Sequence, residues 1–214
     1  MQKIVRVLLA DDHVMVREGL SQILEESDRI NVVGQVGDGS EILQLTDKSN
    51  PDVIVLDYSM PRLDTPSIIE ELRSRFPQVK ILVLTVHEKI HYAVKVLECG
   101  AHGYVVKSAA VRELVDAIES VYRGEVYISS SISQNILQHM RRPKKDRVGL
   151  DALSHREFDI LRGLGAGKTL TECAEYLNIS ISTASTYRSR LMDKLNLRST
   201  AEVIRFAVEN KIVE

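Results

Sequence analysis

Polar side chains follow four apolar runs in the N-terminal part of the chain. Asp11 and Asp12 follow one run, and Asp57, Thr85 and Lys107 each follow another. Clustered carboxylates repel one another and need a cation, and Mg²⁺ prefers such oxygen ligands. An aspartate beside Mg²⁺ could accept a phosphoryl group, whose oxygens a hydroxyl and an ammonium could hold. These residue types therefore predict a phosphoryl-accepting pocket, provided that the fold brings the ends of the runs together.

Alternating apolar runs and amphipathic stretches predict one α/β domain over residues 1–123. We expect a flavodoxin-like fold with a five-stranded parallel sheet of order 2-1-3-4-5. Ligands bind at the carboxyl ends of the strands in such sheets, where strands 1, 3, 4 and 5 would bring the polar side chains to one rim. The expected strands are 4–10, 31–36, 52–57, 80–84 and 103–106, and the expected helices are 15–26, 40–47, 66–75, 89–99 and 111–122.

Four motifs resemble the receiver domain of two-component response regulators over the whole of residues 1–123. They read LLADDH, VIVLDYSMP, ILVLTVH and GAHGYVVKS. The resemblance implies that Asp57 is phosphorylated, and that Asp12, Asp57 and the carbonyl of Ser59 bind Mg²⁺. It also implies the following roles: Asp11 completes the acidic pocket and helps through water, Thr85 and Lys107 sense the phosphate, and Tyr104 occupies the aromatic switch position.

The loop after Asp57 departs from the receiver pattern. Many relatives read MPGMDG, whereas this chain reads MPRLDT, with Arg62 and Thr65 in place of the two glycines. We therefore expect altered geometry in this loop.

Only helical patterns follow residue 150, after an expected linker at 124–149 that includes the basic run RRPKKDR. Residues 150–214 predict a small all-α domain with helices at 154–165, 170–177, 182–195 and 199–209. The second and third of these read as a helix-turn-helix, whose second helix can lie in the major groove of DNA. Polar and basic side chains on that helix could contact bases or phosphates. The expected DNA-binding residues are Thr183, Ser185, Thr186, Tyr187, Arg188, Ser189, Arg190 and Lys194.

Residues 150–212 resemble the DNA-binding domain of the NarL/FixJ family, also called LuxR-type. The family often has lysine at the positions of Ser185 and Ser189, so the departure leaves direct base readout open at both. The resemblance implies that the last helix supplies a dimer contact.

Charge and composition limit the other possibilities. Residues 1–123 carry 14 basic and 19 acidic side chains, which disfavours nucleic-acid binding by that domain. No apolar run approaches the ~18 residues of a membrane span, and the N-terminus lacks a secretory cleavage site. Cys99 and Cys173 have no metal or redox spacing. We expect a cytoplasmic protein without a membrane partner.

The combined prediction is a transcriptional regulator that a sensor histidine kinase phosphorylates on Asp57, and that binds double-stranded DNA as a homodimer. We expect no enzymatic role. A phosphorylation-controlled protein-interaction switch remains an alternative, because Ser185 and Ser189 stand where the family often has lysine. A phosphotransfer enzyme or phosphatase with an aspartate nucleophile also stays open, although the sequence offers neither a cap domain nor a substrate pocket.

Overall fold

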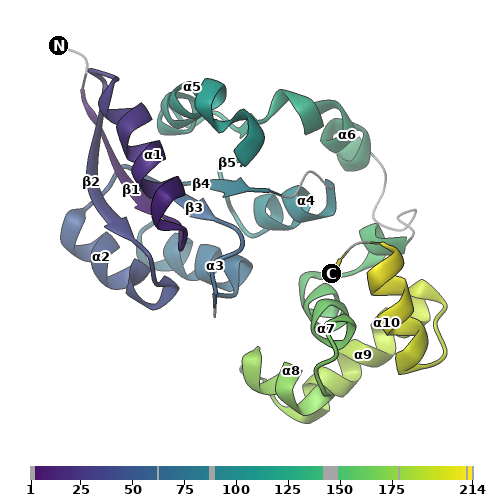
Figure 1. The fold of residues 1–214 in the computed structure, drawn as a ribbon. Helices are drawn as coiled ribbons and strands as arrows, with labels where there is room; N and C mark the ends of the chain where they lie inside the picture. The colour runs from purple at the N-terminus through teal and green to yellow at the C-terminus, as the bar shows by residue number, and fades with distance from the viewer. Residues whose placement is uncertain are drawn as a thin grey trace. The chain divides into compact units, whose positions relative to one another are not determined.

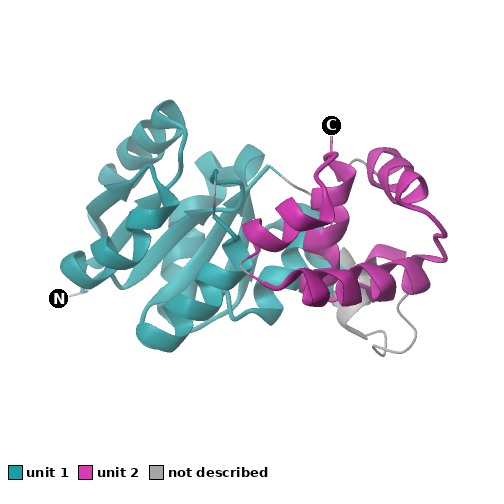
Figure 2. Ribbon diagram, turned by 90° about the horizontal axis from the view of Figure 1, so that it is seen from below, with its two compact units in different colours: residues 1–139 teal, residues 140–214 magenta. Residues whose placement is uncertain are grey.

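The chain forms two compact units, residues 1–139 and 140–214, which Figure 2 distinguishes by colour. The computed structural model describes residues 3–61, 63–86, 90–141, 149–177, 179–210 and 212–213. Arg62 and most of the basic run RRPKKDR lie outside these ranges.

A parallel sheet forms the centre of the first unit, with the order β2-β1-β3-β4-β5-β6. The first five strands have the predicted flavodoxin-like order. The sixth is a difference from the five-stranded prediction. The strands are β1 Val5–Ala10, β2 Ile30–Val36, β3 Val53–Asp57, β4 Lys80–Thr85, β5 Gly103–Val106 and β6 Tyr127–Ile128.

Helices cover both faces of the sheet, α1 and α5 on one and α2, α3 and α4 on the other (Figure 1). The central strands are buried on both faces, as their unbroken apolar runs predict. Leu24 and Ile118 of α1 and α5 pack against strand residues such as Val55 and Leu84. The helices are α1 Val14–Glu25, α2 Ile42–Ser49, α3 Thr65–Arg75, α4 Ile90–Glu98, α5 Ala110–Tyr122 and α6 Ser130–Arg141.

The sheet register brings the predicted pocket residues to one edge. Ala10 of β1 aligns with Leu56 of β3, so Asp11 and Asp57 lie at the next step of neighbouring strands. Asp57 aligns in turn with Leu84 of β4, the residue before Thr85. The side chains that the sequence places after apolar runs therefore share the carboxyl-terminal edge, as predicted.

Part of the segment expected as a linker belongs to the first unit. β6 pairs with β5, and Ser129, which is fully buried, continues the pairing by donating its backbone N–H to the carbonyl of Tyr104 at 2.9 Å. The Ser129 hydroxyl also accepts from Val106 N–H and donates to the Glu113 carboxylate. The first unit consequently extends beyond the expected boundary at 123, because these contacts tie residues 127–129 to β5.

The second unit is all-helical, as predicted. Helix α7 begins after Ser154 with the capping box that the sequence indicates, in which the side chains and backbones of Ser154 and Glu157 bond reciprocally. The core of the second unit contains the fully buried side chains of Phe158, Leu161 and Leu191. The helices are α7 His155–Gly165, α8 Leu170–Tyr176, α9 Ile181–Leu195 and α10 Thr200–Glu209.

None of the helices in the described ranges combines the length and apolar character that crossing a membrane requires. Both cysteines are free: Cys173 is buried, and Cys99 is partly buried. Burial, the largest cause, raises the pKa of the Cys99 thiol to about 12, so it stays protonated at neutral pH.

Candidate functional site

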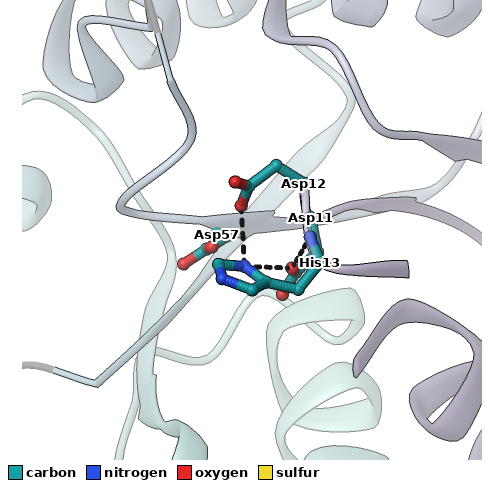
Figure 3. Close-up of side chains that lie close together, drawn as sticks. All are labelled: Asp11, Asp12, His13 and Asp57. Carbon is teal, nitrogen blue, oxygen red and sulfur yellow. Dashed lines mark hydrogen bonds and ion pairs between the residues drawn. The ribbon is translucent and has the colours of Figure 1, made fainter. Parts of the chain in front are cut away.

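Three aspartates and a histidine form a cluster at the carboxyl edge of the sheet in the first unit (Figure 3). Asp11 and Asp57 are each 2% exposed. One ligand atom from each of Asp11, Asp12, His13 and Asp57 lies within 4.8 Å of all the others. The arrangement confirms that the fold gathers the three predicted carboxylates.

Lys107 neutralises part of this charge. Its ammonium lies 2.6 Å from Asp11 Oδ2 and 3.0 Å from Asp57 Oδ2, and its side chain is 16% exposed. Burial disfavours the charged form of Lys107, but the interactions with Asp11 and Asp57 together outweigh it and raise its pKa. Lys107 therefore remains a cation at neutral pH, between two buried carboxylates.

Burial dominates the electrostatics of Asp57. It raises the pKa of the Asp57 carboxyl, and the opposing effects of Lys107 and the Ser59 backbone N–H do not fully compensate. The Ser59 N–H donates to Asp57 Oδ1 at 3.2 Å. Ser59 and Lys107 thus contact the two oxygens of a carboxyl group whose charged form is disfavoured by burial.

The cluster offers oxygen atoms that a cation could bind. Asp12 Oδ1 is buried and has no hydrogen-bond partner among the described residues, although it lies 2.9 Å from His13 Nδ1. His13 was not among the predicted pocket residues. The sequence signal that could have indicated its place in the cluster is its position directly after Asp12. The Arg17 guanidinium also holds the loop after β1, because it donates to the Asp11 carbonyl at 2.5 Å.

Thr85 and Tyr104 lie beside each other in the interior, and both are fully buried. The Tyr104 hydroxyl is hydrogen-bonded to the Thr85 side chain. Burial raises the pKa of Tyr104, so the phenol is neutral at physiological pH. The structure therefore joins the predicted sensing and switch residues, and it holds Tyr104 in the inward position.

The loop after Asp57 begins with two contrasting residues. Tyr58 is buried, whereas Ser59 is exposed. Thr65, one of the two replacements for glycine, is 2% exposed and starts α3. The loop is therefore buried at Tyr58, where it leaves β3, and at Thr65, where it enters α3.

In the second unit, α8 and α9 form the expected helix-turn-helix pair. Ser180 caps α9 by accepting from the Thr183 N–H at 3.0 Å. Ala184 and Leu191 form the buried face of α9. Four of the residues that the sequence predicts for DNA are exposed away from this face: Ser185, Thr186, Ser189 and Arg190.

Family models match both units. The response regulator receiver domain matches residues 7–119, and the luxR family of bacterial regulatory proteins matches residues 151–207. The chain is 36% identical over 206 residues to the response regulator UvrY of Escherichia coli (strain K12), covering 96% of this chain and 94% of that protein. This chain belongs to the NarL/FixJ family of response regulators.

Other relatives of this response regulator align over nearly the whole chain. The oxygen regulatory protein NreC of Staphylococcus carnosus (strain TM300) is 34% identical over 98% of this chain and 99% of its own. RcsB from Salmonella enterica serovar Typhimurium, solved with promoter rprA and the phosphomimetic BeF₃⁻, is 26% identical with a TM-score of 0.75, covering 95% of this chain and 98% of that chain. The two-domain architecture is therefore that of the family.

The predicted DNA-binding residues of the response regulator fall into two groups. Exposed side chains are Ser185, Thr186, Ser189, Arg190 and Lys194, and partly buried ones are Thr183, Tyr187 and Arg188. Ser185 and Ser189 are one helical turn apart on the exposed face. Arg188 donates to the Thr200 hydroxyl at 3.0 Å, which connects α9 to α10. The exposed and the partly buried groups could not be distinguished from the sequence, because the side chains of both are polar.

Lys194, predicted as a DNA contact, makes a structural contact within the second unit. Its ammonium lies 2.7 Å from Oε2 of Glu157, a residue only 2% exposed. Burial works against the charged form of Glu157, but Lys194 and the N-terminal cap at Ser154 outweigh it and lower its pKa. Lys194 thus ties α9 to the start of α7.

We expect Lys194→Met to destabilise the second unit by about 1–2 kcal/mol, because it leaves the buried Glu157 carboxylate without its cation. Chemical denaturation of the full chain, followed by circular dichroism, measures the change. Arg190→Met is the matched control: it removes an exposed cation from the same helix and should cost less than about 0.5 kcal/mol. Equal stabilities of the two variants would contradict a structural role for Lys194.

Proposed function

We propose that a sensor histidine kinase phosphorylates this response regulator on Asp57, and that the phosphorylated chain binds double-stranded DNA as a homodimer. We place this activity in the cytoplasm. The protein would act as a switch, without turnover of an external substrate. One observation carries the proposal: the Lys107 ammonium lies between Asp11 and Asp57, at 2.6 and 3.0 Å.

The acidic cluster fits Mg²⁺. Its donors are mainly hard carboxylate oxygens, and the buried Oδ1 of Asp12 lacks a hydrogen bond among the described residues. Asp12, Asp57 and the backbone carbonyl of Ser59 would hold the ion. Bound Mg²⁺ would screen the charge of an incoming phosphoryl group.

The reaction would form an acyl phosphate. A carboxylate oxygen of Asp57 attacks phosphorus, and the bond between phosphorus and the donor breaks with its electron pair going to the donor. The Lys107 ammonium and the Thr85 hydroxyl are the groups of this chain that would hold the transferred phosphoryl oxygens. Tyr104, hydrogen-bonded to Thr85, would report the change to the face formed by α4 and β5.

Dimerisation would bring two copies of α9 to two half-sites about one DNA turn apart, ~34 Å. The solved RcsB structures support this part of the proposal, since one contains RcsB with promoter rprA and another contains two RcsB dimers bound to two parallel DNAs. In this chain, Ser185 and Ser189 would meet the groove, with Thr186 and Arg190 beside them. Arg190 would add attraction to phosphate.

Intact mass spectrometry tests the phosphorylation. The full chain, incubated with Mg²⁺ and acetyl phosphate and quenched rapidly, should gain one phosphoryl group. Asp57→Asn should gain none, because an amide cannot form the acyl phosphate. Asp52→Asn is the control, because Asp52 lies at the other end of β3 and pairs with Lys3 at 3.1 Å. An adduct on Asp57→Asn would refute the assignment of this residue.

A phosphorylation-controlled protein-interaction switch is the second candidate. It is favoured by the serines at positions 185 and 189, where many relatives have lysine. An electrophoretic shift assay with phosphorylated full-length protein and mixed-sequence duplex DNA at low salt separates the two. Binding supports the regulator, and its absence under these conditions supports the alternative.

A further inference from the structure

We propose that Thr65 is a positioning residue for the phosphoacceptor, acting through the peptide unit that joins Tyr58 and Ser59. The inference rests on the proposed phosphorylation of Asp57. It concerns a position where many relatives have glycine, which offers no side-chain hydroxyl.

The hydroxyl of Thr65 reaches back over the loop after β3. Its Oγ1 donates to the Tyr58 carbonyl at 2.6 Å, and the residue is 2% exposed. Water competes poorly for a hydrogen bond at such a buried position. The start of α3 is therefore linked directly to the residue that follows Asp57.

The same peptide unit contacts the carboxylate on its other side. Its carbonyl belongs to Tyr58 and its N–H to Ser59, and that N–H donates to Asp57 Oδ1 at 3.2 Å. A trans peptide is planar, with its C=O and N–H pointing in opposite directions. A hydrogen bond that fixes the carbonyl consequently fixes the direction in which the N–H points.

The backbone N–H and the ring of Tyr58 make further contacts that fix this residue. Its own N–H donates to the Leu84 carbonyl at 2.8 Å, which extends the pairing of β3 with β4. Its ring packs edge-on against Tyr92 of α4, with centroids 5.1 Å apart. These contacts fix the position of Tyr58, and the Thr65 hydroxyl adds control over the rotation of the peptide after it.

The consequence concerns the carboxylate of Asp57. Its Oδ1 is held by Ser59, and its Oδ2 lies 3.0 Å from Lys107. If the peptide between Tyr58 and Ser59 rotates, Oδ1 loses its donor and the carboxylate turns more freely. Reactions depend strongly on such orientation, so loss of the Thr65 hydroxyl should slow phosphoryl transfer.

Thr65→Val removes the hydroxyl at nearly constant volume. We expect it to slow phosphorylation of the full chain by acetyl phosphate about 5- to 10-fold at saturating Mg²⁺, the size expected for losing one hydrogen bond. Thr65→Ser keeps the hydroxyl and should react within about twofold of the wild type. Intact mass at timed quenches gives the rates.

Thr46→Val is the matched control. Thr46 lies in α2, is 1% exposed, and donates its hydroxyl to the Ile42 carbonyl at 2.7 Å. The substitution therefore removes a buried hydrogen bond from a threonine hydroxyl to a backbone carbonyl, in a helix that carries none of the pocket residues. It should lower stability comparably and leave the rate unchanged.

Nuclear magnetic resonance provides a second readout, which reports directly on the peptide unit between Tyr58 and Ser59. The ¹⁵N–¹H resonance of Ser59 should shift in Thr65→Val and keep its wild-type position in Thr46→Val. If Thr65→Val fails to fold, Thr65→Gly, which installs the residue of many relatives, provides the same loss of hydroxyl. It should show the same slower rate.

The outcomes separate the two proposals. A wild-type chain that gains no phosphoryl group on Asp57 would overturn the proposed function and this inference with it. A wild type that is phosphorylated, with Thr65→Val as fast as Thr46→Val, would overturn the inference alone. A Thr65→Ser rate as slow as that of Thr65→Val would also overturn it, because the hydroxyl would then not be the cause.

Discussion

Replacing Asp57 by asparagine should make this protein more stable at pH 7, by about 1–2 kcal/mol or roughly 3–6 °C in Tm. Burial raises the pKa of Asp57, which means that the folded site disfavours the charged form of this carboxyl group. Asparagine keeps the shape and removes the charge. Lys107 keeps its partner Asp11, at 2.6 Å, in the variant.

The sign of the pH dependence follows from the same shift. A carboxyl with a raised pKa in the folded state imposes no cost below its unfolded pKa, near 3.8. The cost appears as pH rises and is complete above the folded pKa. The stability difference between Asp57→Asn and the wild type should therefore grow from about pH 4 toward neutrality.

Thermal denaturation of the full chain without Mg²⁺ checks this result across that pH range. Asp52→Asn is the control with the opposite expected sign, because Asp52 accepts from Arg6 N–H at 3.0 Å and from Lys3 at 3.1 Å. It should lose stability. If Asp57→Asn were less stable than the wild type at pH 7, Lys107 would outweigh burial at this site. The stability that Asp57→Asn is expected to gain equals the stability that the wild type loses by keeping a reactive carboxylate in the pocket.

The acidic pocket could be predicted from sequence because its signal is local. An apolar run that ends at Asp57 indicates a strand end, and parallel strands present such ends at one edge of the sheet. The same reasoning placed Thr85 and Lys107. Helix bounds were predictable for a similar reason, since apolar periodicity and the cap at Ser154 mark them.

Contacts between distant segments could not be predicted in this way. β6 has only two residues, Tyr127 and Ile128, too few to show a strand period, and its pairing uses the edge of β5 that β4 leaves unpaired. The link from Thr65 to Tyr58 depends on how the loop closes. Lys194 resembled a DNA contact because its partner Glu157 lies 37 residues away in the sequence.

Helix α9 carries the second large effect. We expect Ser189→Glu to weaken DNA binding by the phosphorylated chain at least about 100-fold, because a carboxylate facing phosphates costs several kcal/mol. Ser189 is exposed and lies one turn from Ser185, on the face of α9 opposite Ala184 and Leu191. Fluorescence anisotropy with a mixed-sequence duplex at low salt measures the affinity.

Ser131→Glu controls for the added charge. Ser131 is an exposed serine of α6 outside the second unit, so this variant changes the net charge equally without placing a carboxylate on α9. Its affinity should remain within about threefold of the wild type, a change that surface charge alone can cause. Equal weakening by both substitutions would mean that overall charge governs binding. Unchanged binding by Ser189→Glu would remove this face of α9 from the DNA contact and favour a protein partner for the second unit.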